Sequence, residues 1–291
     1  MRILLASDGS RDSRRAARWL RDFPLPSDTA LCVLTVATLT QPPSQSETMN
    51  EVRDTVRAQA RQAGERARKI LTRRWSEVEV VVTEGDPRVE IVRVAEERRA
   101  DMIALGARGL GAVRGFLLGS VSLTVARYAS CPVLIARGRP RQVRRTLVAV
   151  DGSEGSREAL RFLSIFGLVR EASVRLVHVV QEIPAPSGFR RFITSQTEEQ
   201  LAQEQRKQRA DADEMLARAV AELGGAAGRV EQSVVPGTPA KEIAKMARSS
   251  DVDLVVVGAR GVGAIERLLL GSVSETVVHH AKCPVVIVRR R

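Results

Sequence analysis

The chain has 291 residues, of which 44% are hydrophobic and 27% charged, and its formal net charge is +12. This length exceeds what one hydrophobic core usually serves, so the composition predicts a globular protein of two domains of about 150 residues each. No apolar run approaches the roughly 18 residues that span a bilayer, and Asp8 comes too early in the chain for a secretory signal. We therefore expect a soluble cytoplasmic protein.

The excess of charge comes from arginine, since all but five of the 46 basic residues are arginines. Such an excess attracts polyanions, but these arginines are spread over every expected helix. A solvated surface is the favoured interpretation, and an Arg-rich nucleic-acid-binding protein is the alternative. The cysteines Cys32, Cys131 and Cys283 are odd in number and far apart. They argue for a reducing compartment and against a disulfide framework. Cys131 and Cys283, each followed by a proline, are interpreted as small core residues and not as redox sites.

Short apolar runs alternate with helical patterns along the first half of the chain. The runs cover residues 3–6, 30–37, 78–82, 102–105 and 133–136, and helices are expected to open at Ser10, Asn50, Pro87 and Ser120. Near-continuous apolar strands joined by helices predict an α/β fold, a parallel sheet with helices on both faces. Pro87 and its counterpart Pro239 suit the first position of a helix, which needs no backbone N–H.

The second half repeats the first. Residues 106–137 and 258–289 are identical at 20 of 32 aligned positions, without a gap. Repetition of this extent decides the architecture, because each copy must be one structural unit. We expect two tandem domains, at residues 1–137 and 145–291, joined by a short basic linker at residues 138–142.

The offset between the copies is 143 residues at Asp8 and Asp151 and 152 residues at Gly106 and Gly258, so the second copy carries nine extra residues. We place them in residues 181–197, a Pro- and Ser-containing stretch that reads as a loop. Its counterpart, residues 38–50, is also polar and interrupted by proline. Both copies are therefore expected to have a mobile connection at the same point.

A glycine-rich loop follows the fourth expected strand in each half. In the first half, Gly106 and Gly109 are followed after nine residues by Gly119 and Ser120, and the second half repeats this spacing. Glycines let backbone N–H groups close on phosphate oxygens, and a helix N-terminus adds donors and positive potential. The repeated pattern favours phosphate binding over turn glycines followed by a helix-capping serine. It is neither a Walker loop nor a Rossmann fingerprint.

This spacing, with the opening Asp-Gly-Ser and the closing Cys-Pro-Val of each half, resembles the universal stress protein family over essentially the whole chain, in its tandem form. The resemblance implies two doubly wound domains, each with a five-stranded parallel sheet of order 3-2-1-4-5. It implies a stress-response protein that binds ATP, with a Mg²⁺ ion carried by the phosphates, in the crevice where strands 1 and 4 part. A nucleotide-dependent conformation would then govern its partners.

Carried over by position, the resemblance implies that Asp8 and Asp151 meet the adenosine, and that the backbones of Val36 and Val179 flank the adenine. For Asp8 the alternative is an N-cap of the following helix. Ribose and phosphates are expected at Gly106, Gly109, Gly119, Ser120, Val121 and Ser122 in the first half, and at Gly258, Gly261, Gly271, Ser272, Val273 and Ser274 in the second.

Two further observations bear on the expected sites. Arg108 and Arg260 lie inside the loops, and their residue type fits contact with a phosphate as well as exposure to solvent, so both readings stay open. The second strand ends in His178-Val179 in the second half, as often in the family, but in Thr35-Val36 in the first. Equal affinity of the two sites is therefore in doubt.

Fast turnover is not expected. Phosphoryl transfer needs an aimed base or water-positioning group, and no carboxylate or histidine close to the loop in sequence is repeated in both copies. We assign no catalytic residue, and a slow ATPase or autophosphorylating enzyme is the alternative function. The histidines His178, His279 and His280 all lie in the second half, and adjacent histidines without a third ligand do not predict a metal site.

The fifth expected strands, around residues 133–136 and 285–288, are apolar and lie at the sheet edge in the family topology. Exposed apolar edges invite aggregation, so they are normally covered or paired. We predict that the two edges pair with each other in an internal pseudo-dimer, with a homo-oligomer through the same strands as the alternative.

Overall fold

The computed structural model describes residues 1–39, 48–110, 118–181, 195–224, 229–249, 251–261 and 270–289. Strands and helices alternate in both halves, as predicted. The first half contains β1 (Arg2–Ala6), α1 (Arg11–Asp22), β2 (Ala30–Ala37), α2 (Met49–Leu71), β3 (Val78–Glu84), α3 (Pro87–Glu97), β4 (Met102–Gly106), α4 (Ser120–Tyr128) and β5 (Val133–Ala136). The second contains β6 (Arg145–Ala149), α5 (Glu154–Ile165), α6 (Leu168–Glu171), β7 (Ser173–Val180), α7 (Ser195–Glu222), β8 (Val230–Pro236), α8 (Pro239–Met246), β9 (Leu254–Gly258), α9 (Ser272–His280) and β10 (Val285–Val288).

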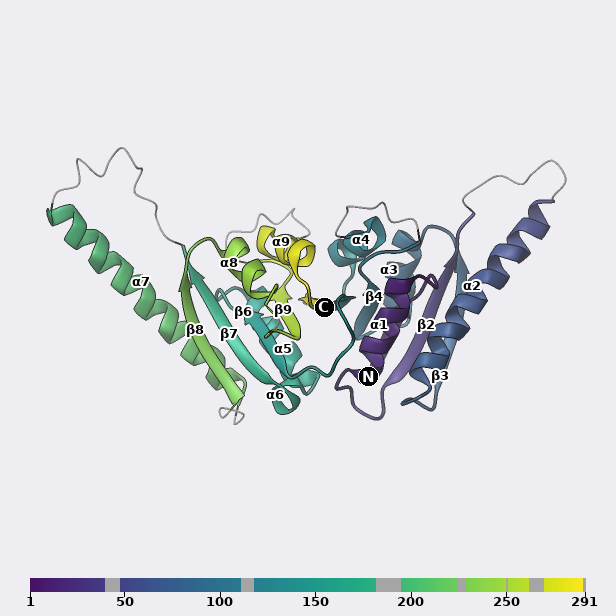
Figure 1. Cartoon of the computed structure of the whole chain (residues 1–291), viewed down its shortest axis with the longest axis horizontal. Helices are drawn as coiled ribbons and strands as arrows, with labels where there is room; N and C mark the ends of the chain where they lie inside the picture. Colours follow the sequence, from purple (N-terminus) through teal and green to yellow (C-terminus); the bar gives the residue numbers. More distant parts are fainter. Residues whose placement is uncertain are drawn as a thin grey trace.

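The ten strands form one sheet, in the order β3-β2-β1-β4-β5-β10-β9-β6-β7-β8 (Figure 1). Each half therefore has the order expected for its five strands, and its neighbouring strands are parallel. At the centre, β5 and β10 are antiparallel, with Leu134 opposite Val286. The predicted pairing of the two fifth strands is confirmed, and it removes both apolar edges from solvent.

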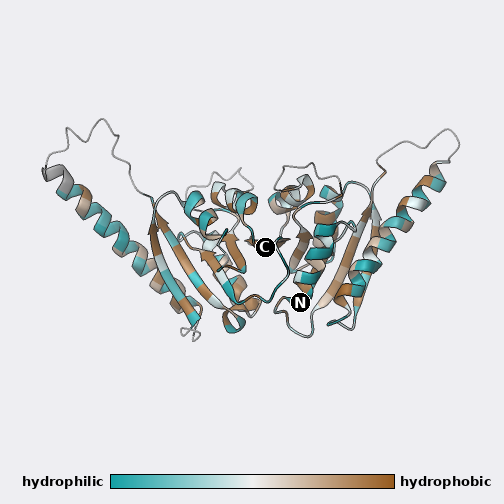
Figure 2. Ribbon diagram, in the orientation of Figure 1, coloured by the Kyte–Doolittle hydropathy of each residue, from teal (hydrophilic) through white to brown (hydrophobic). Residues whose placement is uncertain are grey.

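Alternation along the strands divides the core between the two faces of the sheet. Ile3 and Leu5 pack in the cluster under α1, α2, α5 and α7, whereas Leu4 packs in the cluster under α3, α4, α8 and α9. Figure 2 shows the corresponding concentration of hydrophobic residues in the strands. Because side chains of a strand point alternately to opposite faces, a run without polar residues serves both layers of helices at once.

Short local signals set the starts of the helices next to the strand ends. The hydroxyl of Ser10 accepts a hydrogen bond from the backbone N–H of Ser13 and caps α1, and Ser153 caps α5 in the same way. Pro87 and Pro239 occupy the first positions of α3 and α8, as expected. These helices thus begin directly beyond the carboxyl ends of the strands.

Helices α2 and α7, the longest of their halves, extend beyond the sheet at the two ends of the molecule (Figure 1). Most of the loops expected at residues 38–50 and 181–197 lies outside the described residues, but the interpretation of both as loops to their last residue is wrong. Helix α2 begins at Met49 and α7 at Ser195, and α7 is longer, with 28 residues against 23. The insertion therefore also lengthens a helix, since the start of α7 is rich in Glu and Gln, which favour helices.

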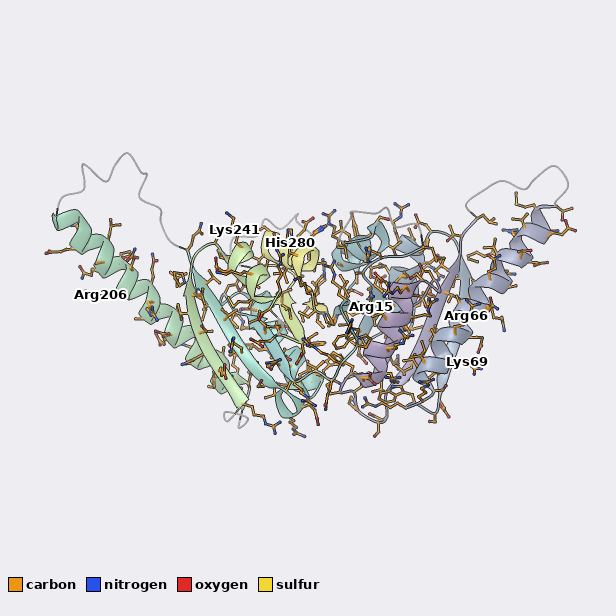
Figure 3. All side chains as sticks on the ribbon, in the orientation of Figure 1. Arg15, Arg66, Lys69, Arg206, Lys241 and His280 are labelled. Atoms are coloured by element: carbon orange, nitrogen blue, oxygen red, sulfur yellow. The ribbon has the colours of Figure 1, made fainter. Side chains whose placement is uncertain are left out.

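Basic side chains lie on the outer helices. Arg66 and Lys69 on α2 and Arg206 on α7 are exposed (Figure 3). This position fits the interpretation of the charge as a solvated surface. Among the described helices, none combines the length and the apolar character that a bilayer crossing requires.

The three cysteines form no disulfide, and Cys131 and Cys283 are buried. Burial raises the pKa of Cys283 to about 12 and that of Cys32 to about 11, so the thiolate form is disfavoured at both positions. Their environment is that of small core residues.

Candidate functional site

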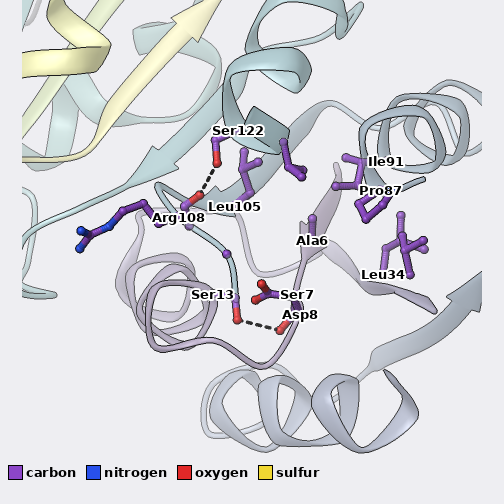
Figure 4. A pocket seen from close by; sticks show the side chains of 14 residues that line it. Ala6, Ser7, Asp8, Ser13, Leu34, Pro87, Ile91, Leu105, Arg108 and Ser122 are labelled. Carbon is purple, nitrogen blue, oxygen red and sulfur yellow. Dashed lines mark hydrogen bonds between the residues drawn. The ribbon is translucent and has the colours of Figure 1, made fainter. Parts of the chain in front are cut away.

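In the first half, a cavity of about 100 Å³ opens at the carboxyl ends of β1, β2 and β4 (Figure 4). This is the point where the strand order reverses, which is where open α/β sheets bind their ligands. Seven of the nine expected residues of this half line the cavity, and Gly119 and Ser120 are not among them. The seven are Asp8, Val36, Gly106, Arg108, Gly109, Val121 and Ser122.

The second half has a larger cavity at the equivalent point, of about 470 Å³. All nine expected residues of this half line it. They are Asp151, Val179, Gly258, Arg260, Gly261, Gly271, Ser272, Val273 and Ser274. Residues far apart in the sequence are thus gathered around one cavity by three strand ends and the start of α9.

The backbone of Val36 faces the first cavity for a reason that lies in the strand geometry. The carbonyl oxygen of Leu34 accepts a 2.9 Å hydrogen bond from the N–H of Ser7, so the main-chain groups of Leu34 point toward β1. Those of Val36, two residues on, point the same way, beyond the end of β1 and into the crevice. The 2.8 Å bond from the N–H of Val150 to the carbonyl of Val177 sets the same direction for Val179.

Asp8 joins the end of β1 to the glycine-rich loop. Its Oδ1 accepts a hydrogen bond from the N–H of Ser10 at 3.0 Å, and its Oδ2 accepts one from the N–H of Leu110 at 2.8 Å. In the second half, Asp151 accepts from the N–H of Ser153 at 3.0 Å. The alternative interpretation of Asp8 as the N-cap of α1 is wrong, because Ser10 holds that position.

Close approaches of the backbone explain four of the glycines. A Cβ on Gly106 would lie 2.5 Å from the carbonyl carbon of Asp12, and one on Gly109 would lie 2.7 Å from Oδ2 of Asp8. The corresponding distances in the second half are 2.5 Å at Gly258 and 2.3 Å at Gly261. A side chain at Gly106 or Gly258 would collide with the backbone at the start of α1 or α5, and one at Gly109 or Gly261 would collide with the carboxylate of Asp8 or Asp151.

The first turn of helix α4 lies at the crevice, where Val121 and Ser122 line the cavity. Its N-cap is Gly119, which has no side chain to cap the helix, so the interpretation of Ser120 as the cap is wrong. The hydroxyl of Ser122 donates to the carbonyl of Gly106 at 2.7 Å, and Ser274 donates to Gly258 at 2.6 Å. These serines fix the helix to the end of the fourth strand, so the N–H groups of the first turn and the positive end of the helix dipole lie at the crevice, an arrangement that suits an anion.

Arg108 does not point at the centre of the first cavity. Its Nε donates to Oδ2 of Asp12 at 3.2 Å, and its side chain is 47% exposed. Figure 4 shows it extending away from Asp8 and Ile91. Arg108 and Arg260 are thus exposed, as one of the two readings expected, and Arg108 has in addition an ion pair that the sequence did not predict.

Sequence reasoning missed the apolar part of both linings. Leu34, Pro87, Ile91 and Leu105 line the first cavity, and Pro239 and Ile243 line the second. These residues lie in strands or in the first two turns of a helix, where the sequence pattern does not separate them from ordinary core positions. Their apolar surface suits the flat face of an aromatic ligand.

The histidines occupy different environments. His178 lines the second cavity, and its Nδ1 lies 2.8 Å from the carbonyl oxygen of Val150. Its counterpart Thr35 is buried, with 1% of its surface exposed. Within the described part of the chain, no three His, Cys, Asp or Glu side chains gather closely enough to hold a metal ion.

Comparison with known proteins agrees with this architecture. The model of the universal stress protein family matches residues 1–137 and 142–289. A universal stress protein of Mycolicibacterium smegmatis is 30% identical, over 99% of this chain and 97% of its own. One of Mycobacterium bovis is 34% identical over 66% of this chain, and this match spans only 60% of the relative's length.

Among solved structures, a universal stress protein of Archaeoglobus fulgidus has a TM-score of 0.69 at 25% identity, with 99% of this chain and 96% of that one covered. A second, described as a putative universal stress protein of Pseudomonas aeruginosa, shares the fold with a TM-score of 0.63 at 14% identity, over 99% and 92% of the two chains. The tandem arrangement of this chain thus has solved counterparts over its full length. The chain belongs to the universal stress protein family and has two such domains in tandem.

Proposed function

We propose that the chain is a cytoplasmic, ATP-binding stress-response protein, and that nucleotide occupancy changes its loops and thereby its binding partners. Residues 1–137 and 145–291 act as the two nucleotide-binding domains. The observation that carries the proposal is the second cavity, where the repeated glycine motif, Asp151 and the start of α9 line one space of about 470 Å³. Pockets for small molecules typically measure roughly 300–1,000 Å³.

The two ends of this cavity suit the two ends of an adenine nucleotide. At the strand end, the backbone of Val179 and the apolar side chains of Pro239 and Ile243 suit a purine. At the other end, Gly261 and the first turn of α9, which begins after Gly271, supply N–H donors and the positive end of a helix dipole for phosphates. A Mg²⁺ ion would be held by phosphate oxygens and water.

The lining supports binding over turnover. Asp8 and Asp151 are the only carboxylates among the described residues that line the cavities. Both oxygens of Asp8 already accept backbone hydrogen bonds, so this carboxylate holds the loop in place and is not aimed as a base. The internal pairing of β5 with β10 occupies the edges that a homodimer through these strands would use.

The proposal is tested by isothermal titration calorimetry with Mg-ATP on the wild type and on the double variant Gly109→Val, Gly261→Val. Each valine would drive a side chain into the carboxylate of Asp8 or Asp151, at 2.7 and 2.3 Å from the new Cβ. We expect heat of binding from the wild type and none from the variant. Circular dichroism should show the same helix content for both proteins.

Two results would overturn the proposal. The first is a wild type that gives no heat with Mg-ATP or with another adenine nucleotide, and that releases no adenine nucleotide on denaturation when examined by mass spectrometry. The second is a folded double variant whose affinity equals that of the wild type, because the loops would then not form the site.

A further inference from the structure

The first turn of the helix after strand 1 carries one acid in each half, but at different positions, Asp12 in α1 and Glu154 in α5. In the first half it carries Asp12, whose side chain is only 8% exposed and forms ion pairs with Arg15 and Arg108. Arg108 belongs to the loop between Gly106 and Gly109, so this carboxylate holds the one arginine of that segment. A nearly buried carboxylate makes a charge-assisted hydrogen bond stronger than an exposed one does.

The second half cannot make this contact. With the offset of 143 residues at the start of the copies, the counterpart of Asp12 is Gly155. A Cβ on Gly155 would lie 2.1 Å from the carbonyl oxygen of Arg260, so the main chain of the loop leaves no room for any side chain there. The loop arginine of the second half is therefore never opposed by an acid at this position.

The two cavities also differ in size, and the first is the smaller. They measure about 100 Å³ in the first half and about 470 Å³ in the second. Leu34 and Leu105 in the lining of the first are replaced by Val177 and Val257 in the second, one methylene fewer at each position. The first cavity is thus smaller and the arginine of its loop is paired with Asp12, whereas the second cavity is larger.

We propose that the two crevices are unequal, with the second half the tighter nucleotide site, and that Asp12 weakens the first site by holding Arg108 away from the phosphates. This inference rests on the proposed function. Asp12 acts here as an anion that competes with phosphate for one guanidinium, a group suited to bidentate contact with either. In the second half no carboxylate at the position of Asp12 competes with phosphate for Arg260.

Variants with one closed site separate the two affinities. Gly109→Val leaves only the second crevice open, and Gly261→Val leaves only the first. In calorimetry with Mg-ATP, we expect the Gly109→Val protein to keep the tighter affinity of the wild type. The Gly261→Val protein should bind at least about tenfold more weakly, which corresponds to the loss of about one good hydrogen bond to a charged group.

The role of Asp12 is tested in the Gly261→Val background. Asp12→Asn should strengthen binding at the first site by about three- to tenfold, since Arg108 is half exposed and its ion pair is partly screened. The same change in the Gly109→Val background should have no effect. Asp22→Asn removes an acid at the other end of α1, paired with Arg21, and serves as the matched control with no effect in either background.

A double-mutant cycle distinguishes competition for Arg108 from simple repulsion between Asp12 and phosphate. If Asp12 acts through Arg108, Asp12→Asn should change nothing once Arg108→Gln is present. An equal gain with and without Arg108 would overturn this part of the inference.

Equal affinities in the two single-site proteins, or a tighter first site, would overturn the inequality while leaving the proposed function intact. A wild type that binds no nucleotide would instead overturn the proposed function, and the inference with it. The thermal unfolding of each variant, measured without nucleotide, verifies that the affinities belong to folded proteins.

Discussion

The guanidinium of Arg137, just after β5, donates a 3.0 Å hydrogen bond to the carbonyl oxygen of His279, in the last turn of α9 in the other half. The same nitrogen lies 3.2 Å from the carbonyl of Ala281. The counterpart Arg289 donates to Ala126, near the end of α4, at 2.8 Å. Each half therefore places a cation at the carboxyl end of a helix in the other half, where the helix dipole favours it.

We predict that Arg137→Gln destabilises the chain by roughly 2 kcal/mol, because the carbonyls of His279 and Ala281 lose charged donors in a buried place. Burial lowers the pKa of Arg137 to about 10, so the group stays charged at neutral pH and its loss removes a cation. Urea unfolding followed by circular dichroism measures the change. Arg139→Gln, at an exposed arginine two residues on, is the control and should have little effect. Equal stability of both variants would contradict the prediction.

Hydrogen exchange should reveal the central strand pair as a stable part of the sheet. Leu134 and Val286 face each other, and the side chains of both strands are buried. We expect the amides of residues 133–135 and 285–287 that donate in the ladder to exchange about as slowly as those of β1 and β4. Strand β3, at the outer edge of the sheet, should exchange faster. Fast exchange at the central pair with slow exchange at β1 would mean that the halves separate in solution.

Features that depend on residues close together in the sequence were predictable, whereas contacts between residues far apart in the sequence were not. The strands were predictable from apolar runs and the internal repeat, and their order came from the resemblance to the family. The pairing of β5 with β10 then followed from the need to cover the edge that this order leaves. The pair of Asp12 with Arg108 was not, because these residues are 96 positions apart and meet only through the path of the loop. In the sequence, Asp12 is merely an acid three residues before Arg15 on a helix.

The same limit explains Arg137 and the size of the crevices. Arg137 is the last residue of the first repeat, directly before the basic linker, and nothing in the sequence indicates that its guanidinium reaches the other half. Leu105 and Val257 are both apolar residues before a glycine, and only the geometry of the crevice makes their difference a matter of volume. The sequence pattern predicts which positions are apolar, polar or charged. A contact between the halves depends in addition on how the two folded halves are placed relative to each other.

The interface should weaken as the pH falls through the range of histidine. Partial burial, with smaller contributions from Arg137, His280 and Arg127, lowers the pKa of His279 below its usual value near 6.5. Between the two pKa values the unfolded chain binds a proton that the folded chain does not, so stability is full above pH 6.5 and falls as the pH drops toward the folded pKa. Thermal unfolding from pH 8 to pH 5 should show a smaller loss for His279→Gln than for the wild type. An identical pH dependence in the two proteins would contradict this assignment.

The packing of α2 against the sheet can be tested with Gly64→Ala, whose effect on the free energy of unfolding should differ in sign between two backgrounds. A Cβ on Gly64 would lie 2.5 Å from Cγ1 of Val80 on β3, so Gly64→Ala overpacks this contact at a cost of about 1–3 kcal/mol. Alanine also favours the helix over glycine by about 1 kcal/mol, so the single variant should be destabilised by the difference.

In the Val80→Ala background the clash is absent and only the helix preference of alanine remains. Gly64→Ala should then stabilise the chain by about 0.5–1 kcal/mol, and the coupling energy of the cycle, measured by urea unfolding, should be at least about 1 kcal/mol. If Gly64→Ala has the same effect on stability in both backgrounds, the contact with Val80 is not what excludes a side chain at position 64. The second nearest neighbour, Cγ2 of Thr35 at 3.3 Å, would then be the residue to vary, because it packs the same helix against β2, the strand that ends at the crevice.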